Sequence, residues 1–190
     1  MSTVVMLGGN GYLGRNVTQK WMAKDPDARF VVVSRSGKNA LADARITNVQ
    51  ADSADCEAVM KVMPEQVDYN VDFVGRPEKD PEQFRRFNDA PADVMLRIAR
   101  QKKVKAMGMI GGVLGPKSFV EGKKRIIEKL KASGIRTEYV SPTLVYGNGR
   151  NDSMSRMVPL LKFFGIFSKN MRPVHVNDVA DELVRKMIGE

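Results

Sequence analysis

The chain has 190 residues, of which 43% are hydrophobic and 28% charged, and its formal net charge is +9. This length suits one α/β domain with a buried core, and the composition is that of a soluble globular protein. The single cysteine, Cys56, excludes an internal disulfide, and no apolar run approaches the ~18 residues of a membrane span. Because an apolar strand begins close to Met1, leaving no room for a targeting segment ahead of it, we expect a cytoplasmic protein.

The first expected element is a strand over residues 4–7, followed by a glycine loop with glycines at 8, 11 and 14. Gly8 permits a sharp turn, Gly11 lets a pyrophosphate approach the backbone, and Gly14 lets the next helix pack closely on the strand. That helix, expected over residues 12–22, would direct free N–H groups and the positive end of its dipole at the phosphates. The loop therefore predicts a dinucleotide-binding Rossmann fold; the alternative is an ordinary glycine-rich turn.

The second strand, expected over residues 30–33, is followed by Ser34, Arg35 and Ser36. In a dinucleotide fold this strand end meets the adenosine ribose, where a carboxylate would bind the 2′-hydroxyl of NAD. No acidic residue stands here. Because a guanidinium can bind a phosphate through two hydrogen bonds, Arg35 favours NADP, with NAD as the alternative cofactor. A basic surface turn without a ligand is the competing interpretation.

The rest of the chain alternates expected strands with expected helices. Strands separated in this way pair in parallel through right-handed crossovers, which predicts a doubly wound parallel sheet with its ligand cleft at the carboxyl ends of the strands. Each strand is followed by a candidate cleft residue, and Asp52 could reach the adenine edge from such a position. The strands are expected over 46–51, 69–74 and 105–110, ending at Asp52, Gly75 and Gly111, and the helices over 55–63 and 82–102, the latter irregular at Pro91.

Three later segments carry a family resemblance. They are Phe87-Asn88, the run Ser141-Pro142-Thr143-Leu144-Val145-Tyr146-Gly147, and the run Arg172-Pro173-Val174-His175-Val176-Asn177-Asp178-Val179-Ala180. Together with the glycine loop they resemble the atypical branch of the short-chain dehydrogenase/reductase superfamily, over nearly the whole chain. That branch includes epimerase-like proteins, NmrA-like regulators and the nucleotide-binding accessory subunit of respiratory complex I.

The resemblance implies a catalytic Ser, Tyr and Lys, with the last two spaced Tyr-x-x-x-Lys on one helix. The matching lysine is Lys123, but the tyrosine position holds Phe119 and the serine position falls on Gly111 or Gly112. A phenyl ring exchanges no proton and glycine has no hydroxyl. The resemblance therefore leaves Lys123 as a ligand of the nicotinamide ribose. Tyr146 is the best alternative proton donor, or else a residue packed beneath the cofactor.

We expect residues 148–172 to form a lid or substrate region within a single NAD(P)-binding domain over 1–190. Residues 157–167 are strongly apolar with one charge. Such a run can cap a pocket for a flat apolar acceptor, dock on a protein partner, lie on a membrane surface or form ordinary core. We expect His175 to be a structural hydrogen-bonding residue and Asn177 to cap a final helix over 178–187.

Basic residues concentrate between Arg97 and Lys131, largely on expected helices with apolar residues between them. This spacing is typical of a solvated helix face. No aromatic platform or nucleic-acid-binding module accompanies it, so nucleic-acid binding is the least favoured use of these charges.

The sequence thus predicts an NADP(H)-binding protein, either an oxidoreductase that lacks the usual Ser and Tyr or a non-catalytic dinucleotide sensor or assembly factor. We predict no metal site, and Lys123 and Tyr146 are the catalytic candidates. The residues expected to contact the dinucleotide are Gly8, Gly9, Asn10, Gly11, Tyr12, Leu13, Gly14, Ser34, Arg35, Ser36, Asp52, Val74, Gly75, Ile110, Gly111, Lys123 and Pro142.

Overall fold

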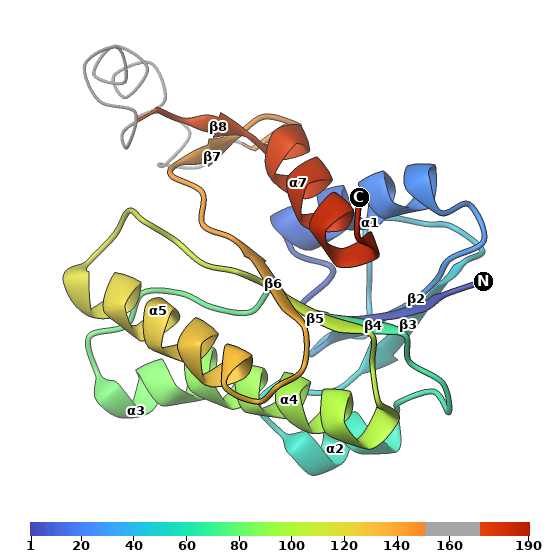
Figure 1. Ribbon diagram of the computed structural model, residues 1–190, viewed down its shortest axis with the longest axis horizontal. Coiled ribbons are helices and arrows are strands. Elements are labelled where there is room, and N and C mark those ends of the chain that lie inside the picture. The colour runs from blue at the N-terminus through green and yellow to red at the C-terminus, as the bar shows by residue number, and fades with distance from the viewer. Residues whose placement is uncertain (151–171) are drawn as a thin grey trace.

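The computed structural model describes residues 1–150 and 172–190. Its centre is a six-stranded sheet in which every strand pairs in parallel with its neighbours, in the order β3-β2-β1-β4-β5-β6 (Figure 1). The predicted doubly wound parallel sheet is therefore confirmed. The strands are β1 (Thr3–Leu7), β2 (Arg29–Ser34), β3 (Ile46–Gln50), β4 (Tyr69–Asp72), β5 (Ala106–Ile110) and β6 (Thr137–Val140).

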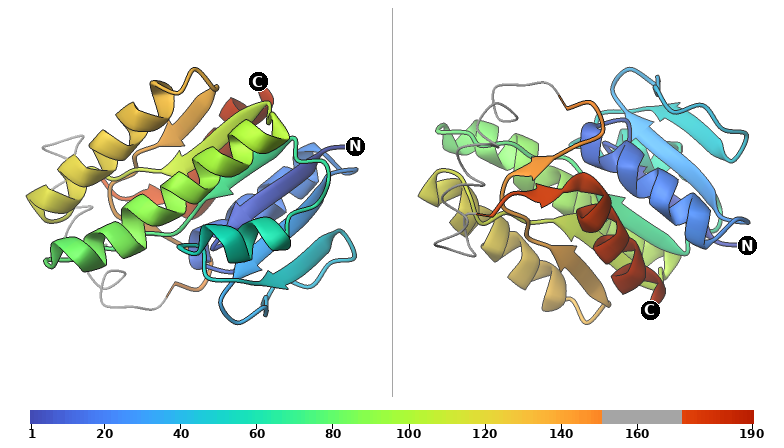
Figure 2. Two further views of the ribbon diagram at one scale, coloured as in Figure 1. Left: turned by 90° about the horizontal axis from the view of Figure 1, so that it is seen from below. Right: turned by 90° about the horizontal axis from the view of Figure 1, so that it is seen from above.

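Helices cover both faces of this sheet (Figures 1 and 2). α1 (Tyr12–Lys24) and α7 (Val176–Ile188) pack together on one face. The other face carries α2 (Cys56–Lys61), α4 (Ala90–Lys102) and α5 (Lys117–Lys131). Because side chains alternate along a strand, each buried strand supplies both hydrophobic layers. In β1, for example, Val4 and Met6 join the α1/α7 core, while Val5 and Leu7 join the core under α4 and α5.

The helix expected over residues 82–102 is divided by a π-helical turn. α3 (Pro81–Phe84) leads into the turn η1 (Arg85–Asp89), and α4 follows. The expected irregularity therefore lies just before Pro91. Proline crowds the carbonyl four residues earlier and donates no hydrogen bond, so the preceding turn widens.

β4 is shorter than the expected strand over 69–74, because it ends at Asp72. The Asp72 carboxylate accepts a hydrogen bond from the backbone N–H of Val74 at 2.8 Å, which turns the chain out of the sheet. Gly75 follows with φ at +153°, a value that side-chain-bearing residues rarely adopt. This early turn brings Val74 and Gly75 over the carboxyl ends of the strands.

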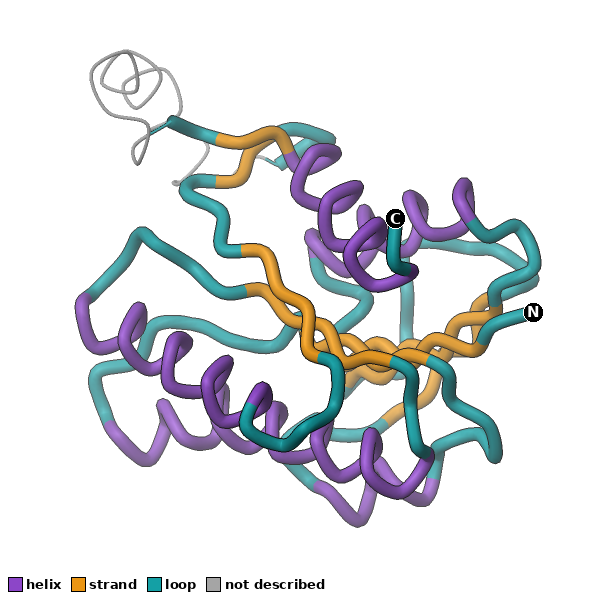
Figure 3. The backbone as a smooth tube through the Cα atoms, viewed as in Figure 1, coloured by secondary structure: helices purple, strands orange, loops and turns teal. Residues whose placement is uncertain are grey.

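A small second sheet lies at the carboxyl end of β6 (Figure 3). It pairs β7 (Val145–Tyr146) in parallel with β8 (Val174–His175). α7 starts directly after β8, and the His175 Nδ1 atom accepts a hydrogen bond from the backbone N–H of Asn177 at 3.2 Å. The expectation that Asn177 caps a helix over 178–187 is wrong. His175 caps a helix that starts earlier, because its ring reaches the free N–H of the first turn.

Most of the expected lid over 148–172, including the apolar run 157–167, lies outside the described residues. Within the described ranges, no helix is both long enough and apolar enough to cross a membrane. The basic helices α4 and α5 carry exposed ion pairs to neighbouring acidic residues. These pairs are Arg97 with Glu57 at 2.9 Å, Arg125 with Asp89 at 2.6 Å, and Lys129 with Asp93.

Candidate functional site

The glycine loop after β1 forms the floor of the site. Gly8 has φ at +71°, and a Cβ on Gly14 would overlap the backbone of Gly9. Gly11 is different, because a Cβ there would meet only the Gly8 carbonyl oxygen, at 3.2 Å. Gly11 also precedes the first residue of α1 and supplies no side-chain cap, so first-turn N–H groups are left for an anion. The loop therefore offers a backbone cradle of the size and polarity of a diphosphate group.

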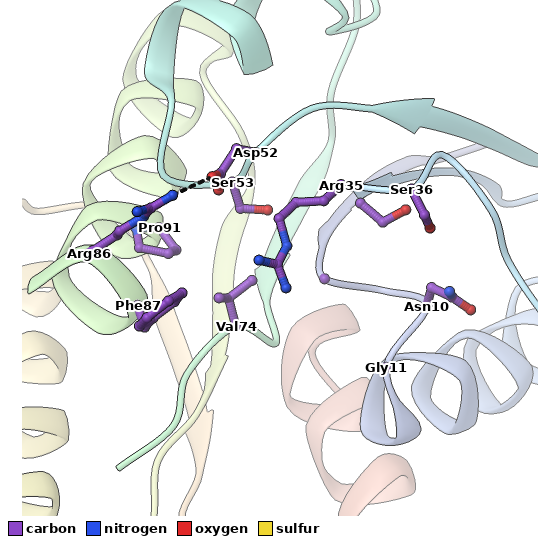
Figure 4. A pocket seen from close by; sticks show the side chains of 12 residues that line it. Asn10, Gly11, Arg35, Ser36, Asp52, Ser53, Val74, Arg86, Phe87 and Pro91 are labelled. Atoms are coloured by element: carbon purple, nitrogen blue, oxygen red, sulfur yellow. Dashed lines mark ion pairs between the residues drawn. The ribbon is translucent and has the colours of Figure 1, made fainter. Parts of the chain in front are cut away.

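A cavity of about 370 Å³ opens above this loop, at the carboxyl ends of β1, β2, β3 and β4 (Figure 4). β2 and β3 lie on one side of β1, and β4, β5 and β6 lie on the other. Doubly wound folds bind their ligands at this switch in strand order. The cavity is lined by Gly8, Asn10, Gly11, Ser34, Arg35, Ser36, Asp52, Ser53, Val74, Arg86, Phe87 and Pro91.

Arg35 is the most prominent side chain in this cavity. It follows the last residue of β2 and projects into the open space between the glycine loop and Val74 (Figure 4). Its side chain is exposed and has no ion pair or hydrogen bond within residues 1–150 and 172–190. The hydroxyl-bearing residues Ser34 and Ser36 flank it. Arg35 is therefore a cation available to an anionic ligand.

The opposite wall carries residues that the sequence did not single out as ligands. Arg86 reaches from the π-helical turn to the Asp52 carboxylate, at 3.6 Å (Figure 4). Phe87, from the same turn, lies 3.8 Å below the Arg76 guanidinium, measured to the ring centroid. Only the π-helical turn aims these residues at the cavity, so a regular helical pattern could not have indicated them. Ser53 was detectable, because it follows the strand end at Asp52.

Several other expected contact residues lie around the cavity rather than in it. Gly9 and Gly14 pack against each other behind the loop, and Leu13 and Ile110 pack against the α1/α7 core. The Tyr12 hydroxyl donates to the Gly147 carbonyl oxygen at 2.7 Å. These residues therefore shape the site from outside the cavity wall.

The positions at which the family resemblance places the catalytic serine and tyrosine lie together. A Cβ on Gly112 would be 3.7 Å from the Phe119 ring, and the Lys123 ammonium lies 6.0 Å from the centre of that ring. A side chain on Gly111 would instead overlap the Ser141 hydroxyl. The serine position that faces the tyrosine position is therefore Gly112.

Lys123 is almost fully buried, at 4% exposed, and donates to the Val74 carbonyl oxygen at 3.2 Å. Burial lowers its pKa, while the nearby carboxylates of Asp72 and Asp89 oppose that shift. Burial also raises the pKa of Asp72 to about 6, against the effects of Lys123 and the Val74 N–H. The Lys123 ammonium and the Asp72 carboxylate therefore both bond to the backbone of Val74, a residue that lines the cavity, without a direct ion pair between them.

Tyr146 and Pro142 do not line the nucleotide cavity. They belong to a second cavity of about 540 Å³ beside β6, β7 and α7, which His175 also lines. The rings of Tyr146 and His175 meet edge to face, with their centroids 5.3 Å apart. Within the described ranges, no group of three or more His, Cys, Asp and Glu side chains is arranged to hold a metal ion.

Comparison with known proteins places this geometry in context. The model of the NAD dependent epimerase/dehydratase family matches residues 4–118. The WbmH enzyme of Bordetella bronchiseptica, solved in complex with NAD+, has a TM-score of 0.75 at 18% identity, over 100% of this chain and 73% of that one. The GalE-like L-threonine dehydrogenase of Cupriavidus necator, in its holo form, has a TM-score of 0.77 at 10% identity, over 98% and 72%.

A structure of UDP-glucose 4-epimerase gives a TM-score of 0.74 at 15% identity, over 100% of this chain and 74% of that one. At these identities, the structural matches establish the fold. No curated protein sequence matches this chain.

Proposed function

This chain belongs to the NAD dependent epimerase/dehydratase family, and from that premise we propose that it is an NADP(H)-binding oxidoreductase that works without a tyrosine acid. The nucleotide fits the residues present. Gly11 leaves room for a diphosphate at the start of α1, and the cavity of about 370 Å³ extends from there to Arg35 and Asp52. The bound cofactor would supply hydride chemistry, and the chain would supply position and charge.

The observation that carries the preference for NADP is Arg35. Its side chain projects into the cavity at the end of β2, beside the hydroxyls of Ser34 and Ser36. A carboxylate at this strand end would repel a 2′-phosphate, whereas a guanidinium binds it through charge-assisted hydrogen bonds. The acid that does line the cavity, Asp52, follows β3 instead and is paired with Arg86.

The arrangement of Phe119, Gly112 and Lys123 limits the chemistry. Neither Phe119 nor Gly112 can hold or protonate a substrate oxygen. Lys123 has a binding role on this proposal, with its ammonium directed at the ribose hydroxyls of the nicotinamide half. We therefore expect acceptors that need no strong acid from the protein, such as a flavin or a quinone.

The test is nucleotide binding by isothermal titration calorimetry. Wild-type protein should bind NADPH more tightly than NADH, and Arg35→Gln should weaken NADPH about 10- to 100-fold, the loss expected for charge-assisted hydrogen bonds. Its affinity for NADH should change by no more than about twofold, since NADH has no 2′-phosphate. Arg29→Gln is the matched control, because Arg29 begins the same strand at its opposite end. If the wild-type protein binds neither nucleotide, the proposal is abandoned.

A second candidate function is a non-catalytic dinucleotide sensor or assembly factor. The loss of both hydroxyls, at Gly112 and Phe119, favours it, because binding would survive while acid catalysis would not. Steady NADPH oxidation with a small quinone distinguishes the two functions. Turnover that disappears in the Gly11→Ala variant supports the oxidoreductase, and tight binding without turnover supports the sensor.

A further inference from the structure

Three buried polar side chains lie around Val74 and Gly75, and Val74 lines the nucleotide cavity. Asp72 ends β4 and is 2% exposed, Asn88 lies in the π-helical turn at 0%, and Lys123 lies in α5 at 4%. A Cβ on Gly75 would overlap the Lys123 ammonium and lie 2.9 Å from the Asn88 Oδ1 atom. Both groups therefore converge on one point beside the strand end.

The hydrogen bonds of this cluster are incomplete. Asp72 Oδ1 accepts from the Val74 N–H at 2.8 Å, but Asp72 Oδ2 has no partner among the residues that the structure describes. The Asn88 amide donates to the carbonyl oxygens of Arg76 and Phe84, at 2.9 and 3.2 Å, while its own Oδ1 is also without a partner in the described ranges. Buried acceptors are nearly always paired, so each of these two oxygens offers a place to a further donor.

Lys123 has the matching donors. An ammonium carries three N–H groups, and within the described residues Lys123 uses one of them, toward the Val74 carbonyl oxygen. The charged groups that act on it are Asp72 from β4 and Asp89 from the π-helical turn, and Asp89 is itself paired with Arg125 of α5. Asp72 has no other charged neighbour, because Lys123 is the only charge that acts on it within the described part of the chain.

We propose that Asp72 is the positioning residue of Lys123. Both side chains bond to the backbone of Val74 without a direct ion pair between them, so the carboxylate attracts the ammonium toward the end of β4, and the ribose of a bound dinucleotide draws it forward. This inference rests on the proposed function, which makes Lys123 a ribose ligand. Withdrawal of the ammonium leaves a buried carboxylate without its counter-charge, so Asp72 takes up a proton from water when the nucleotide binds. Binding and protonation of Asp72 are therefore linked, and affinity falls as the pH rises.

The experiment measures dissociation constants for NADPH and NADH between pH 6 and pH 8, and proton uptake by calorimetry in two buffers of different ionisation enthalpy. Wild-type protein should take up protons on binding, and its Kd for NADH should rise about fivefold across this range, which linkage to one carboxyl allows. NADH is the cleaner probe, because the 2′-phosphate of NADPH titrates near pH 6 itself.

Asp72→Asn keeps the acceptor for the Val74 N–H and removes the charge. We expect it to retain its pH 6 affinity at pH 8 and to lose the proton uptake. The matched control is Asp68→Asn, which removes a buried carboxylate directly before the first residue of β4. Its proton uptake and the pH dependence of its Kd should equal those of the wild type. Lys123→Met is a second route to the same answer, since it should also abolish the proton uptake, although it weakens binding.

The outcomes separate the two proposals. If the wild-type protein binds neither nucleotide at any pH, the proposed function fails and this inference fails with it. If the nucleotides bind but proton uptake is zero in the wild type, or equal in the wild type and Asp72→Asn, only the role of Asp72 is overturned. Proton uptake that is lost in both Asp72→Asn and Lys123→Met supports it.

Discussion

The Phe119 ring faces Gly112, and a Cβ on Gly112 would lie 3.7 Å from its Cε1 atom. In the superfamily that the sequence resembles, a tyrosine and a serine hold the substrate oxygen from these two positions. In this chain neither Phe119 nor Gly112 carries a hydroxyl, and Lys123, one helical turn after Phe119, is buried behind the wall of the nucleotide cavity.

This relationship predicts a gain of function. The double variant Gly112→Ser/Phe119→Tyr places two hydroxyls beside Lys123, and Gly112 has no neighbour closer than the Phe119 ring that a serine would displace. General acid catalysis typically contributes 10²–10⁴-fold, so we expect NADPH-dependent reduction of a small carbonyl probe such as isatin to rise by at least about 100-fold. The single variants are the controls. An unchanged rate in a double variant that still binds NADPH would contradict this assignment of the two positions.

Two glycines of the same loop should respond differently to alanine. A methyl group on Gly11 meets only the Gly8 carbonyl oxygen, so Gly11→Ala should fold with a loss of no more than about 1 kcal/mol, yet block the approach of a diphosphate. A methyl group on Gly14 overlaps the Gly9 backbone, so Gly14→Ala should cost about 1–3 kcal/mol of unfolding free energy. Denaturant unfolding and NADPH calorimetry on both variants check this. Equal losses of stability would contradict the loop packing described here.

The free energy of unfolding should depend on pH through the titration of Asp72. Its pKa is about 6 in the folded state, against 3.8 in an unperturbed chain, so the unfolded state loses this proton first as the pH rises. The free energy of unfolding should therefore fall through this group between about pH 4 and pH 6, by about 3 kcal/mol in total, and stay level above that. Asp72→Asn should lack this fall, which urea unfolding from pH 4 to pH 7 measures.

Asp68 provides a control, because its pKa is shifted in the opposite direction from that of Asp72. Although burial opposes it, hydrogen bonds from the Thr3 N–H and Lys105 lower the pKa of Asp68, so its stabilising effect is present above its unfolded pKa and is lost as the pH falls further. The difference between Asp68→Asn and the wild type should accordingly stay nearly constant above about pH 5 and shrink only in more acidic solution. A pH profile of Asp72→Asn that follows Asp68→Asn would contradict the assignment for Asp72.

Local sequence was sufficient for the fold and for the floor of the site. Apolar runs predicted the strands at 4–7, 30–33, 69–74 and 105–110, because a strand buried in a parallel sheet needs apolar side chains on both faces. The same reasoning located Gly8, Gly11, Arg35 and Asp52, which each follow a strand and line the cavity. Parallel strands bring their carboxyl ends to one edge, so adjacency along the edge follows from strand order alone.

The opposite wall depended on tertiary structure. The π-helical turn at Arg85–Asp89 rotates Arg86 and Phe87 toward the cavity, and that turn exists because Pro91 interrupts a helix that is packed against the sheet. Likewise, His175 rather than Asn177 caps α7, because pairing of β8 with β7 places the His175 ring over the first turn. Neither outcome could be predicted from spacing along the chain.

The sequence alone determined a parallel sheet, a glycine loop after its first strand and a cation, Arg35, after its second, since each follows from residue type and distance to a strand end. The absence of a catalytic tyrosine is what the family resemblance implies. Tertiary structure alone decided that Asp72, Asn88 and Lys123, which are distant in sequence, are buried around Val74 and Gly75. Because burial removes water from all three side chains, their charged and hydrogen-bonding groups need partners from the protein or from a ligand.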